Sequence, residues 1–371
     1  MKRYFLGMAA GYTGAGWLSH LFTVGRKKDY QALTDFLAQK YGGKTILTKN
    51  GRSALALALK AYFEPGDVVL VNGFTCYAVY EAVKAAGLEP VFVDISKDDL
   101  NFTAKTLVSG LERAGDKKVK GLIVQNTLGN PVDIEAVERF AKKHELKIIE
   151  DLAHSAGVRY ADGREVGTVG VATALSFGKD KSIDTISGGA VVLRDTCLHE
   201  IKAPSKIPKL SDHLRARFYP MFGGMCRGLT RIHIGGALMR FLVAIHWVER
   251  SADNKLDLKR KPSKFETRLA LKQLKDLRRA GEPPLRDFCF VKNRSILLRK
   301  LQGKGYYFSG FWYEKPVSPE RYYKKVNFPE SECPTATYVA SHIINIPTYY
   351  SKADLKTALE LIDKYKEDER E

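Results

Sequence analysis

The stretch LKIIEDLAHSAGVRYADGREVGTVGVATALSFGKDKSIDTISGGAVVLR, residues 146–194, decides the fold of this chain. It holds three short apolar runs, each the length of a buried strand and each separated from the next by glycines and polar residues. The runs are LKIIED (146–151), ATALSF (172–177) and GAVVLR (189–194). Continuous apolar runs are typical of strands that are covered on both faces.

The sequence before this stretch repeats the pattern, with helix-like segments between the runs. The earlier runs are DVVLV (67–71), PVFVD (90–94) and GLIVQ (121–125), and the helical segments are 53–63, 76–87, 103–114 and 133–145. Strands and helices that alternate at this spacing form βαβ units. The sequence therefore predicts an α/β fold with a mostly parallel sheet and helices on both faces.

The pattern changes beyond about residue 255. A charged helix is expected over 263–277, a strand within 341–348 and an amphipathic helix over 352–365. Strands and helices are segregated here, which is typical of an α+β arrangement. We therefore expect three parts: an N-terminal apolar segment (1–30), a large α/β domain (31–255) and a smaller C-terminal domain (256–371).

Charge and cysteine content restrict the partners and the compartment. Sixty Lys and Arg against 42 Asp and Glu give a net charge of +18. This excess favours phosphorylated small molecules, nucleic acid or an anionic membrane, although a lysine-rich surface alone would also produce it. No nucleic-acid-binding signature is present, so nucleic acid is not expected as a partner. Five widely spaced cysteines without a CxxC pair predict neither disulfides nor a metal site, and favour the cytoplasm.

Two segments have the composition of membrane-contacting sequence. The first, residues 4–25, has no charged residue, but its five glycines argue against a spanning or cleaved helix. The second, residues 213–248, has no acidic residue and combines five arginines with many apolar side chains. It suits the surface of an anionic membrane. A buried helix pair and a dimer interface are the alternatives.

Reactive side chains follow the apolar runs. Ligands of parallel sheets bind at the carboxyl ends of the strands. Asp151 ends one run, Ser176 lies at the end of the next, and Lys181 follows five residues later. We expect these side chains to meet at one edge of the sheet.

From about Tyr30 to Leu193, and again over 263–277 and 334–348, the chain resembles the DegT/DnrJ/EryC1/StrS family of sugar aminotransferases, which are fold-type-I enzymes dependent on pyridoxal 5'-phosphate (PLP). The fragments that carry the resemblance are NGRSALALAL (50–59), PGDVVLVNGFT (65–75), GLEPVFVDI (87–95), GNPVDIEAVERFAKKHELKIIEDLAHSAG (129–157) and SFGKDKSIDTISGGAVV (176–192). The resemblance implies PLP as cofactor and a seven-stranded sheet of the PLP-transferase type.

The resemblance also implies roles for the two principal residues. Lys181 would bind the cofactor and act as general base at the substrate carbon, a role open to lysine when a desolvated, cationic site lowers its pKa. Lys179 is the alternative. Asp151 would keep the pyridine nitrogen protonated, unless it only caps a helix, and its neighbour Glu150 is expected to be structural.

Further cofactor contacts follow from the same match. Gly51, Arg52 and Ser53 open a helix whose amides would hold the phosphate, and Ser176 would add a hydroxyl. A plain helix start is the alternative for that segment. His154 matches a position near the cofactor's phenolic oxygen, and a core histidine is the alternative reading.

The chain departs from the family in two places. Where the family commonly places an aromatic ring over the cofactor, this sequence has Cys76, with Tyr77 next as the substitute. The substrate-side GxNxRM-like motif is missing, and the 213–248 segment stands in its place. Since related dehydratases replace the lysine by histidine, the lysine kept here favours transamination.

The expected function is transfer of an amino group from an amino acid, with glutamate as the expected donor, to a nucleotide-linked keto sugar by a homodimer. Two alternatives stay open. One is a PLP transaminase or lyase that acts on a different substrate, one held at a membrane by the basic segment 213–248. The other is a PLP scaffold that binds without catalysis.

Overall fold

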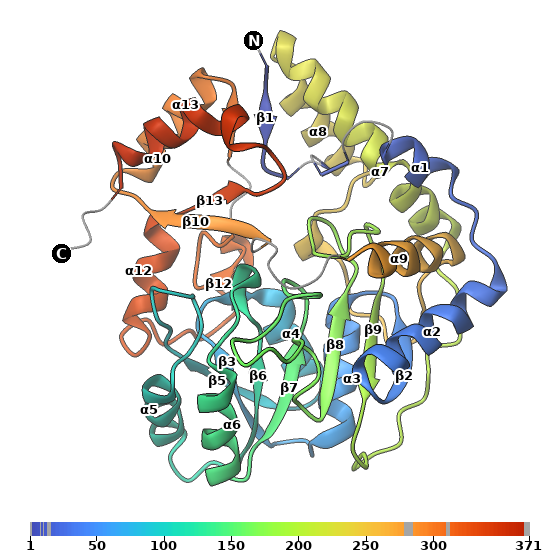
Figure 1. The fold of residues 1–371 in the computed structure, drawn as a ribbon, viewed down its shortest axis with the longest axis vertical. Helices are drawn as coiled ribbons and strands as arrows, with labels where there is room; N and C mark the ends of the chain where they lie inside the picture. The colour runs from blue at the N-terminus through green and yellow to red at the C-terminus, as the bar shows by residue number, and fades with distance from the viewer. Residues whose placement is uncertain are drawn as a thin grey trace.

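A seven-stranded sheet forms the centre of the computed structural model, which describes residues 2–7, 9, 11–12, 16–277, 285–308 and 312–366 (Figure 1). The strand order is β2-β9-β8-β7-β6-β3-β5, and only β9 runs antiparallel to its neighbours. The strands are β2 (Lys44–Thr48), β3 (Val68–Asn72), β5 (Glu89–Val93), β6 (Val119–Val124), β7 (Lys147–Asp151), β8 (Ala172–Ser176) and β9 (Gly189–Leu193). The α/β fold and all six predicted runs are confirmed, and β2 is an additional edge strand.

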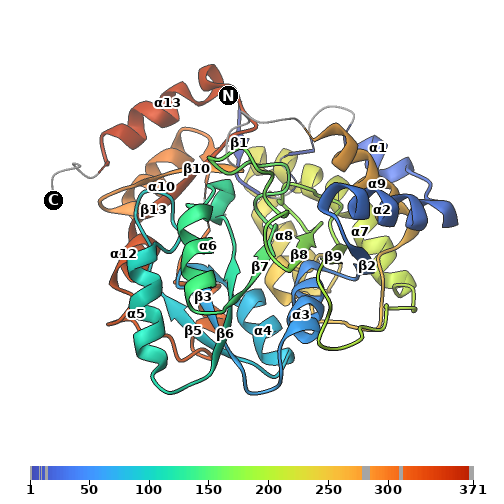
Figure 2. The same ribbon diagram turned by 60° about the horizontal axis from the view of Figure 1, so that its bottom comes forward.

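Helices cover both faces of this sheet, as the sequence predicts (Figures 1 and 2). The helices α3 (Gly51–Tyr62) and α4 (Tyr77–Ala85) share one core with Ile149 and alternate residues of the other strands. The opposite core contains Ile148 and residues of α2 (Lys27–Tyr41), α5 (Ala104–Ala114), α6 (Ile134–Lys143) and α9 (Lys264–Asp276). The alternation of side chains along each strand assigns neighbouring residues to different cores.

The C-terminal part builds a separate small core around an antiparallel strand pair, β10 (Arg286–Phe290) and β13 (Ile343–Pro347). The core is closed by α10 (Arg294–Gly303) and α13 (Lys352–Asp363), and the short β11 (Tyr306–Tyr307) pairs with β1 (Tyr4–Phe5) from the N-terminus. Further elements are β4 (Thr75–Cys76), β12 (Val317–Ser318), α11 (Glu320–Tyr323) and α12 (Pro334–His342). Parts of the expected segments 1–30 and 256–371 lie outside the described residues.

The basic apolar segment folds into two helices, α7 (Leu210–Leu229) and α8 (Gly235–Ala244), which we call the α7–α8 hairpin. Its inner side forms a core with Phe265 of α9, and α1 (Gly16–Phe22) packs along α7. Within the described parts of the chain, no helix has both the length and the apolarity needed to cross a bilayer.

His20 joins α1 to α7 and makes this contact sensitive to pH. Its ring is 1% exposed, and Nε2 lies 3.0 Å from the carbonyl oxygen of Ala216, which can only accept. Burial lowers the pKa of His20 from 6.5 to about 4. Between these two values the unfolded chain binds a proton that the folded chain does not bind. The free energy of unfolding therefore falls as the pH falls through this window.

Between about pH 7 and pH 4.5, we expect the free energy of unfolding of the wild type to fall by about 2–3 kcal/mol more than that of His20→Gln, because glutamine does not titrate. Urea unfolding of both proteins at the two pH values measures the difference. An equally steep acid loss in both would contradict the assignment.

Candidate active site

The carboxyl ends of β6, β7 and β8 meet the N-terminus of α3 at one cavity, which we call the strand-end cavity. Most of the residues predicted from the sequence line it, namely Gly51, Arg52, Asp151, His154, Ser176 and Lys181. Asn50, Cys76, Gln125 and Tyr313 are further residues of its wall. Gln125 directly follows β6, so the strand-end rule could have found it.

Lys181 and His154 form the polar centre of the cavity. Lys181 Nζ lies 2.9 Å from His154 Nε2, and His154 Nδ1 accepts a hydrogen bond from the backbone amide of Leu128 at 3.1 Å. Burial lowers the pKa of His154 well below its usual range, and the nearby Lys181 and Arg286 lower it further. Since Nδ1 accepts, the neutral ring carries its proton on Nε2. That proton points at the Lys181 amine.

Burial also lowers the pKa of Lys181. Cys76 and Asp151 oppose this shift, whereas the positive charge of Arg286 adds to it. An amine that loses its proton more readily than an ordinary lysine is suited to nucleophilic and base chemistry.

Two aromatic side chains from the C-terminal part close the cavity over Lys181 and His154. The Trp312 ring stacks on His154 with centroids 4.7 Å apart, and Lys181 Nζ lies 4.3 Å from the Trp312 centroid. The Tyr313 hydroxyl lies 3.3 Å from His154 Nε2. Buried Arg286 lies over Trp312 at 3.6 Å. Sequence reasoning missed these three residues. Trp312 and Tyr313 lie in a segment with no strand or helix period, and Arg286 opens β10 (Arg286–Phe290), outside the central sheet.

Asp151 is buried at the end of β7, and Oδ1 accepts a hydrogen bond from the Ala153 amide at 3.0 Å. Burial raises its pKa, while the Ala153 amide and Lys181 oppose the rise. The side-chain oxygen of Gln125, in the same wall, is buried and has no hydrogen-bond partner among the described residues. A ligand with a cationic or N–H group would satisfy both acceptors.

The N-terminus of α3 has the features of an anion site. Asn50 caps the helix by accepting from the Ser53 amide at 3.0 Å, so the amides of Gly51 and Arg52 precede the first intrahelical bond. A Cβ at Gly51 would lie 2.5 Å from Ser176 Cβ, so only glycine lets Ser176 pack this closely against the start of α3. The Arg52 guanidinium contacts Glu81 and the Ser251 carbonyl.

Two candidate residues, Ser53 and Tyr77, lie outside the strand-end cavity. The Ser53 hydroxyl bonds Asn50 and the Asp257 amide instead of the cavity. The Tyr77 ring stacks on Tyr322 with centroids 4.6 Å apart, and Cys76 occupies the cavity wall.

Lys179, the alternative to Lys181, points to the α7–α8 hairpin. Its Nζ bonds the Glu249 carbonyl and lies 4.2 Å from the Tyr219 centroid. These contacts leave Lys181 as the lysine beside His154.

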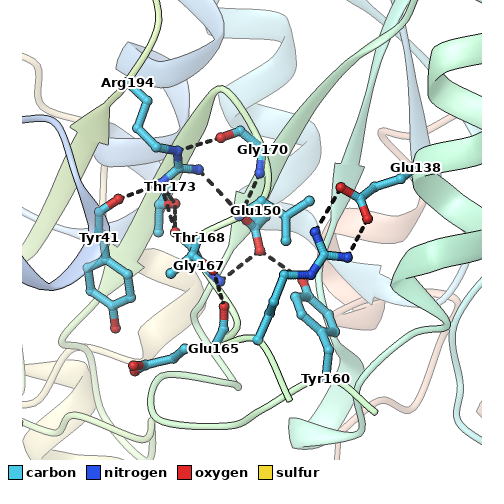
Figure 3. Close-up of polar contacts among 12 residues, drawn as sticks. Tyr41, Glu138, Glu150, Tyr160, Glu165, Gly167, Thr168, Gly170, Thr173 and Arg194 are labelled. Carbon is cyan, nitrogen blue, oxygen red and sulfur yellow. Dashed lines mark hydrogen bonds and ion pairs between the residues drawn. The ribbon is translucent and has the colours of Figure 1, made fainter. Parts of the chain in front are cut away.

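Glu150 lies on the opposite face of β7 from Asp151 and holds the loop between β7 and β8 (Figure 3). It is fully buried and accepts hydrogen bonds from the Tyr160 hydroxyl and three backbone amides, those of Gly167, Val169 and Gly170. Arg194 adds an ion pair at 3.3 Å. These contacts agree with the structural role expected from the sequence.

We expect Glu150→Gln to lower the free energy of unfolding by about 3–5 kcal/mol, because Arg194 and the loop amides lose a buried carboxylate. Glu138→Gln is the matched control: this carboxylate also binds an arginine, Arg164 at 2.9 Å, but at the surface. Glu138→Gln should lower the free energy of unfolding by less than about 1 kcal/mol. Equal losses in urea unfolding would contradict this difference.

We expect Gly51→Ala to lower the free energy of unfolding by about 1–3 kcal/mol, because the new methyl group would clash with Ser176. The double variant Gly51→Ala/Ser176→Gly should recover part of the loss, because Ser176 Cβ and Oγ are the nearest atoms. Gly228→Ala, in α7 with open space around the new methyl, should be neutral or stabilising. Thermal unfolding of the wild type, Gly51→Ala, Ser176→Gly and the double variant measures this cycle, with Gly228→Ala as the control. Additive effects of the two single substitutions would contradict the proposed clash.

Comparison with known proteins agrees with this geometry. Residues 19–218, more than half of the chain, match the DegT/DnrJ/EryC1/StrS aminotransferase family. GDP-perosamine synthase of Escherichia coli O157:H7 is 36% identical over 170 residues, which cover 44% of this chain and 45% of that protein. GDP-4-keto-6-deoxy-D-mannose 3-dehydratase of Yersinia pseudotuberculosis is 31% identical over 192 residues, covering 49% and 47%. The chain thus spans less than half the length of these curated relatives.

A solved structure extends the likeness in fold to nearly the whole chain. The DegT DnrJ EryC1 StrS aminotransferase from Brucella abortus matches with a TM-score of 0.66 at 20% identity, covering 98% of this chain and 99% of that one. The match at this identity concerns the fold. Together with the matched residues 19–218, it leads to one conclusion: this chain belongs to the DegT/DnrJ/EryC1/StrS aminotransferase family.

Proposed function

We propose that this protein is a PLP-dependent aminotransferase that moves an amino group from an amino acid, glutamate being the expected donor, to a nucleotide-linked keto sugar. The observation that carries the proposal is the Lys181–His154 pair, because it places a buried lysine amine with a lowered pKa against an imidazole nitrogen and near a buried carboxylate. The GDP-perosamine synthase name of one relative supports a sugar acceptor.

The residues of the strand-end cavity fit PLP group by group. The phosphate matches the amides of Gly51 and Arg52 with the Ser176 hydroxyl, and we call these groups the phosphate cradle. Glycine at position 51 lets the Ser176 hydroxyl lie directly beside the start of α3. The ring nitrogen matches Asp151, and the phenolic oxygen matches His154. When bound, PLP supplies an electron sink for the reacting amine.

Within this site each protein group has a separate task. Lys181 Nζ moves the proton at the substrate carbon, and His154 Nε2–H points at that amine. The Leu128 amide fixes the tautomer of His154. Trp312 and Tyr313 cover the pair and limit the access of water.

Lysine at position 181 favours transamination over dehydration. One relative of this chain is a GDP-4-keto-6-deoxy-D-mannose 3-dehydratase, so the family name alone leaves both reactions open. The dehydratases related to this family replace the lysine by histidine. A lysine amine provides both the covalent link and the base that transfer requires.

The test is the visible absorbance of the PLP-loaded protein before and after glutamate is added. We expect a visible band in the wild type that glutamate bleaches with release of 2-oxoglutarate, and no responsive band in Lys181→Ala. Lys179→Ala is the matched control and should keep the band, since that side chain contacts the hairpin. A band in Lys181→Ala that still responds to glutamate would overturn the assignment.

Other results of the same assay identify the alternatives. Release of free ammonia instead of transfer to an acceptor would indicate a lyase. A band that no amino acid alters would indicate a binding scaffold.

We also propose a cytoplasmic homodimer, with a large cofactor domain (31–255), a smaller C-terminal domain (256–371) and peripheral membrane contact through residues 213–248. All five cysteines are free, which supports a reducing compartment. The family resemblance supports the dimer. Light scattering of the purified protein measures its mass directly.

A further inference from the structure

The α7–α8 hairpin lies at the periphery of the molecule, beside α1 (Figure 1). Tyr219, Cys226 and Leu242 are buried on the inner side together with Phe265 of α9. This packing fixes the hairpin on the protein, so its exposed side chains form a defined surface.

That outer surface is strongly apolar, and we call it the docking face. Five large apolar side chains between the end of α7 and the residues after α8 are at least 40% exposed: Ile232, Ile234, Phe241, Ile245 and Trp247. Single exposed apolar residues are ordinary, but a cluster of this kind marks an interaction site.

Positive charge accompanies the apolar side chains. Arg231 and Arg240 are exposed among them, and residues 213–248 contain no acidic residue. A groove beside the same helices is lined by Arg3, Arg227 and Arg231 together with Trp17 and Met225, and its described lining has no carboxylate. Ordinary surface helices offset their cations with acidic side chains. Arg215 does so with Glu249 at 2.8 Å, whereas no acidic residue lies within the sequence 213–248 that carries Arg231 and Arg240.

We infer that the docking face binds the surface of an anionic lipid bilayer, with Phe241 and Ile245 among the acyl chains and Arg231 and Arg240 at the phosphates. The combination of exposed apolar rings and unopposed arginines complements an anionic interface. A symmetric contact with a second copy is disfavoured, because Arg231 and Arg240 would approach their own copies in a protein of charge +18.

The hairpin also forms a wall of the reaction cavity, so docking bears on the substrate. A cavity of about 960 Å³ extends from Lys181 and Trp312 to Met239 and Val243 of α8. Docking would therefore set this wall of the cavity against the bilayer. This inference deepens the proposed membrane contact by assigning its face and its lipid class.

The test is sedimentation of the PLP-loaded full chain with vesicles of phosphatidylcholine alone or mixed with phosphatidylglycerol. We expect binding to the anionic vesicles only, weakened by added salt. Phe241→Ser/Ile245→Ser should reduce binding about tenfold or more, and Arg231→Gln/Arg240→Gln should reduce it and its salt dependence. Matched controls are Val108→Ser/Ile296→Ser for exposed apolar residues and Arg299→Gln/Lys304→Gln for exposed charge.

Four outcomes would overturn the inference: no binding to anionic vesicles, equal binding to neutral ones, equal losses in the control variants, or dissociation of a dimer by Phe241→Ser/Ile245→Ser. The last would make this surface a contact between copies. Response of the bound PLP to glutamate is recorded in the same samples. A protein that responds to glutamate but does not bind vesicles would contradict the docking inference alone. A protein that binds vesicles but does not respond to glutamate would contradict the aminotransferase proposal alone.

Discussion

Two adjacent carboxylates at the end of β7 point to opposite faces of the sheet, and the rest of the site depends on this alternation. Glu150 turns toward the loop between β7 and β8 and binds its amides. Asp151 turns toward the N-terminus of α3 and the strand-end cavity. A shift of β7 by one residue in its strand pairing would turn each of its side chains to the opposite face of the sheet. The buried network around Glu150 opposes such a shift and so keeps Asp151 in the cavity.

The α7–α8 hairpin supports the loop that carries Lys181. Ile186, in the loop that carries Lys181, is buried in the same core as Ala216 and Tyr219 of α7. Lys179 bonds the Glu249 carbonyl just after α8. Residues of the hairpin and of the segment after it therefore contact the loop that carries Lys181. Changes in this hairpin would reach the chemistry as well as the protein surface.

The sequence predicts the sheet well because its central strands are covered on both faces and appear as unbroken apolar runs. β2 escaped prediction, since this edge strand has a mixed burial pattern and begins with exposed Lys44. Asp151 and Ser176 followed from strand ends, and Lys181 and His154 from the family resemblance. Trp312 and Arg286 come from far along the chain, and tertiary packing alone brings them to Lys181. Local patterns contain no information on such contacts.

The cradle at α3 and the loop that carries Lys181 are joined by backbone. The Gly188 amide and the Ser187 hydroxyl both bond the Lys49 carbonyl, and the next residue, Asn50, caps α3. Opening either segment would break contacts of the other, so the two form one cooperative unit. A ligand that binds only the cradle would then also raise the free energy of opening the lysine loop. In hydrogen exchange, an anion at α3 would slow the amides of residues 177–188, several of which it does not touch.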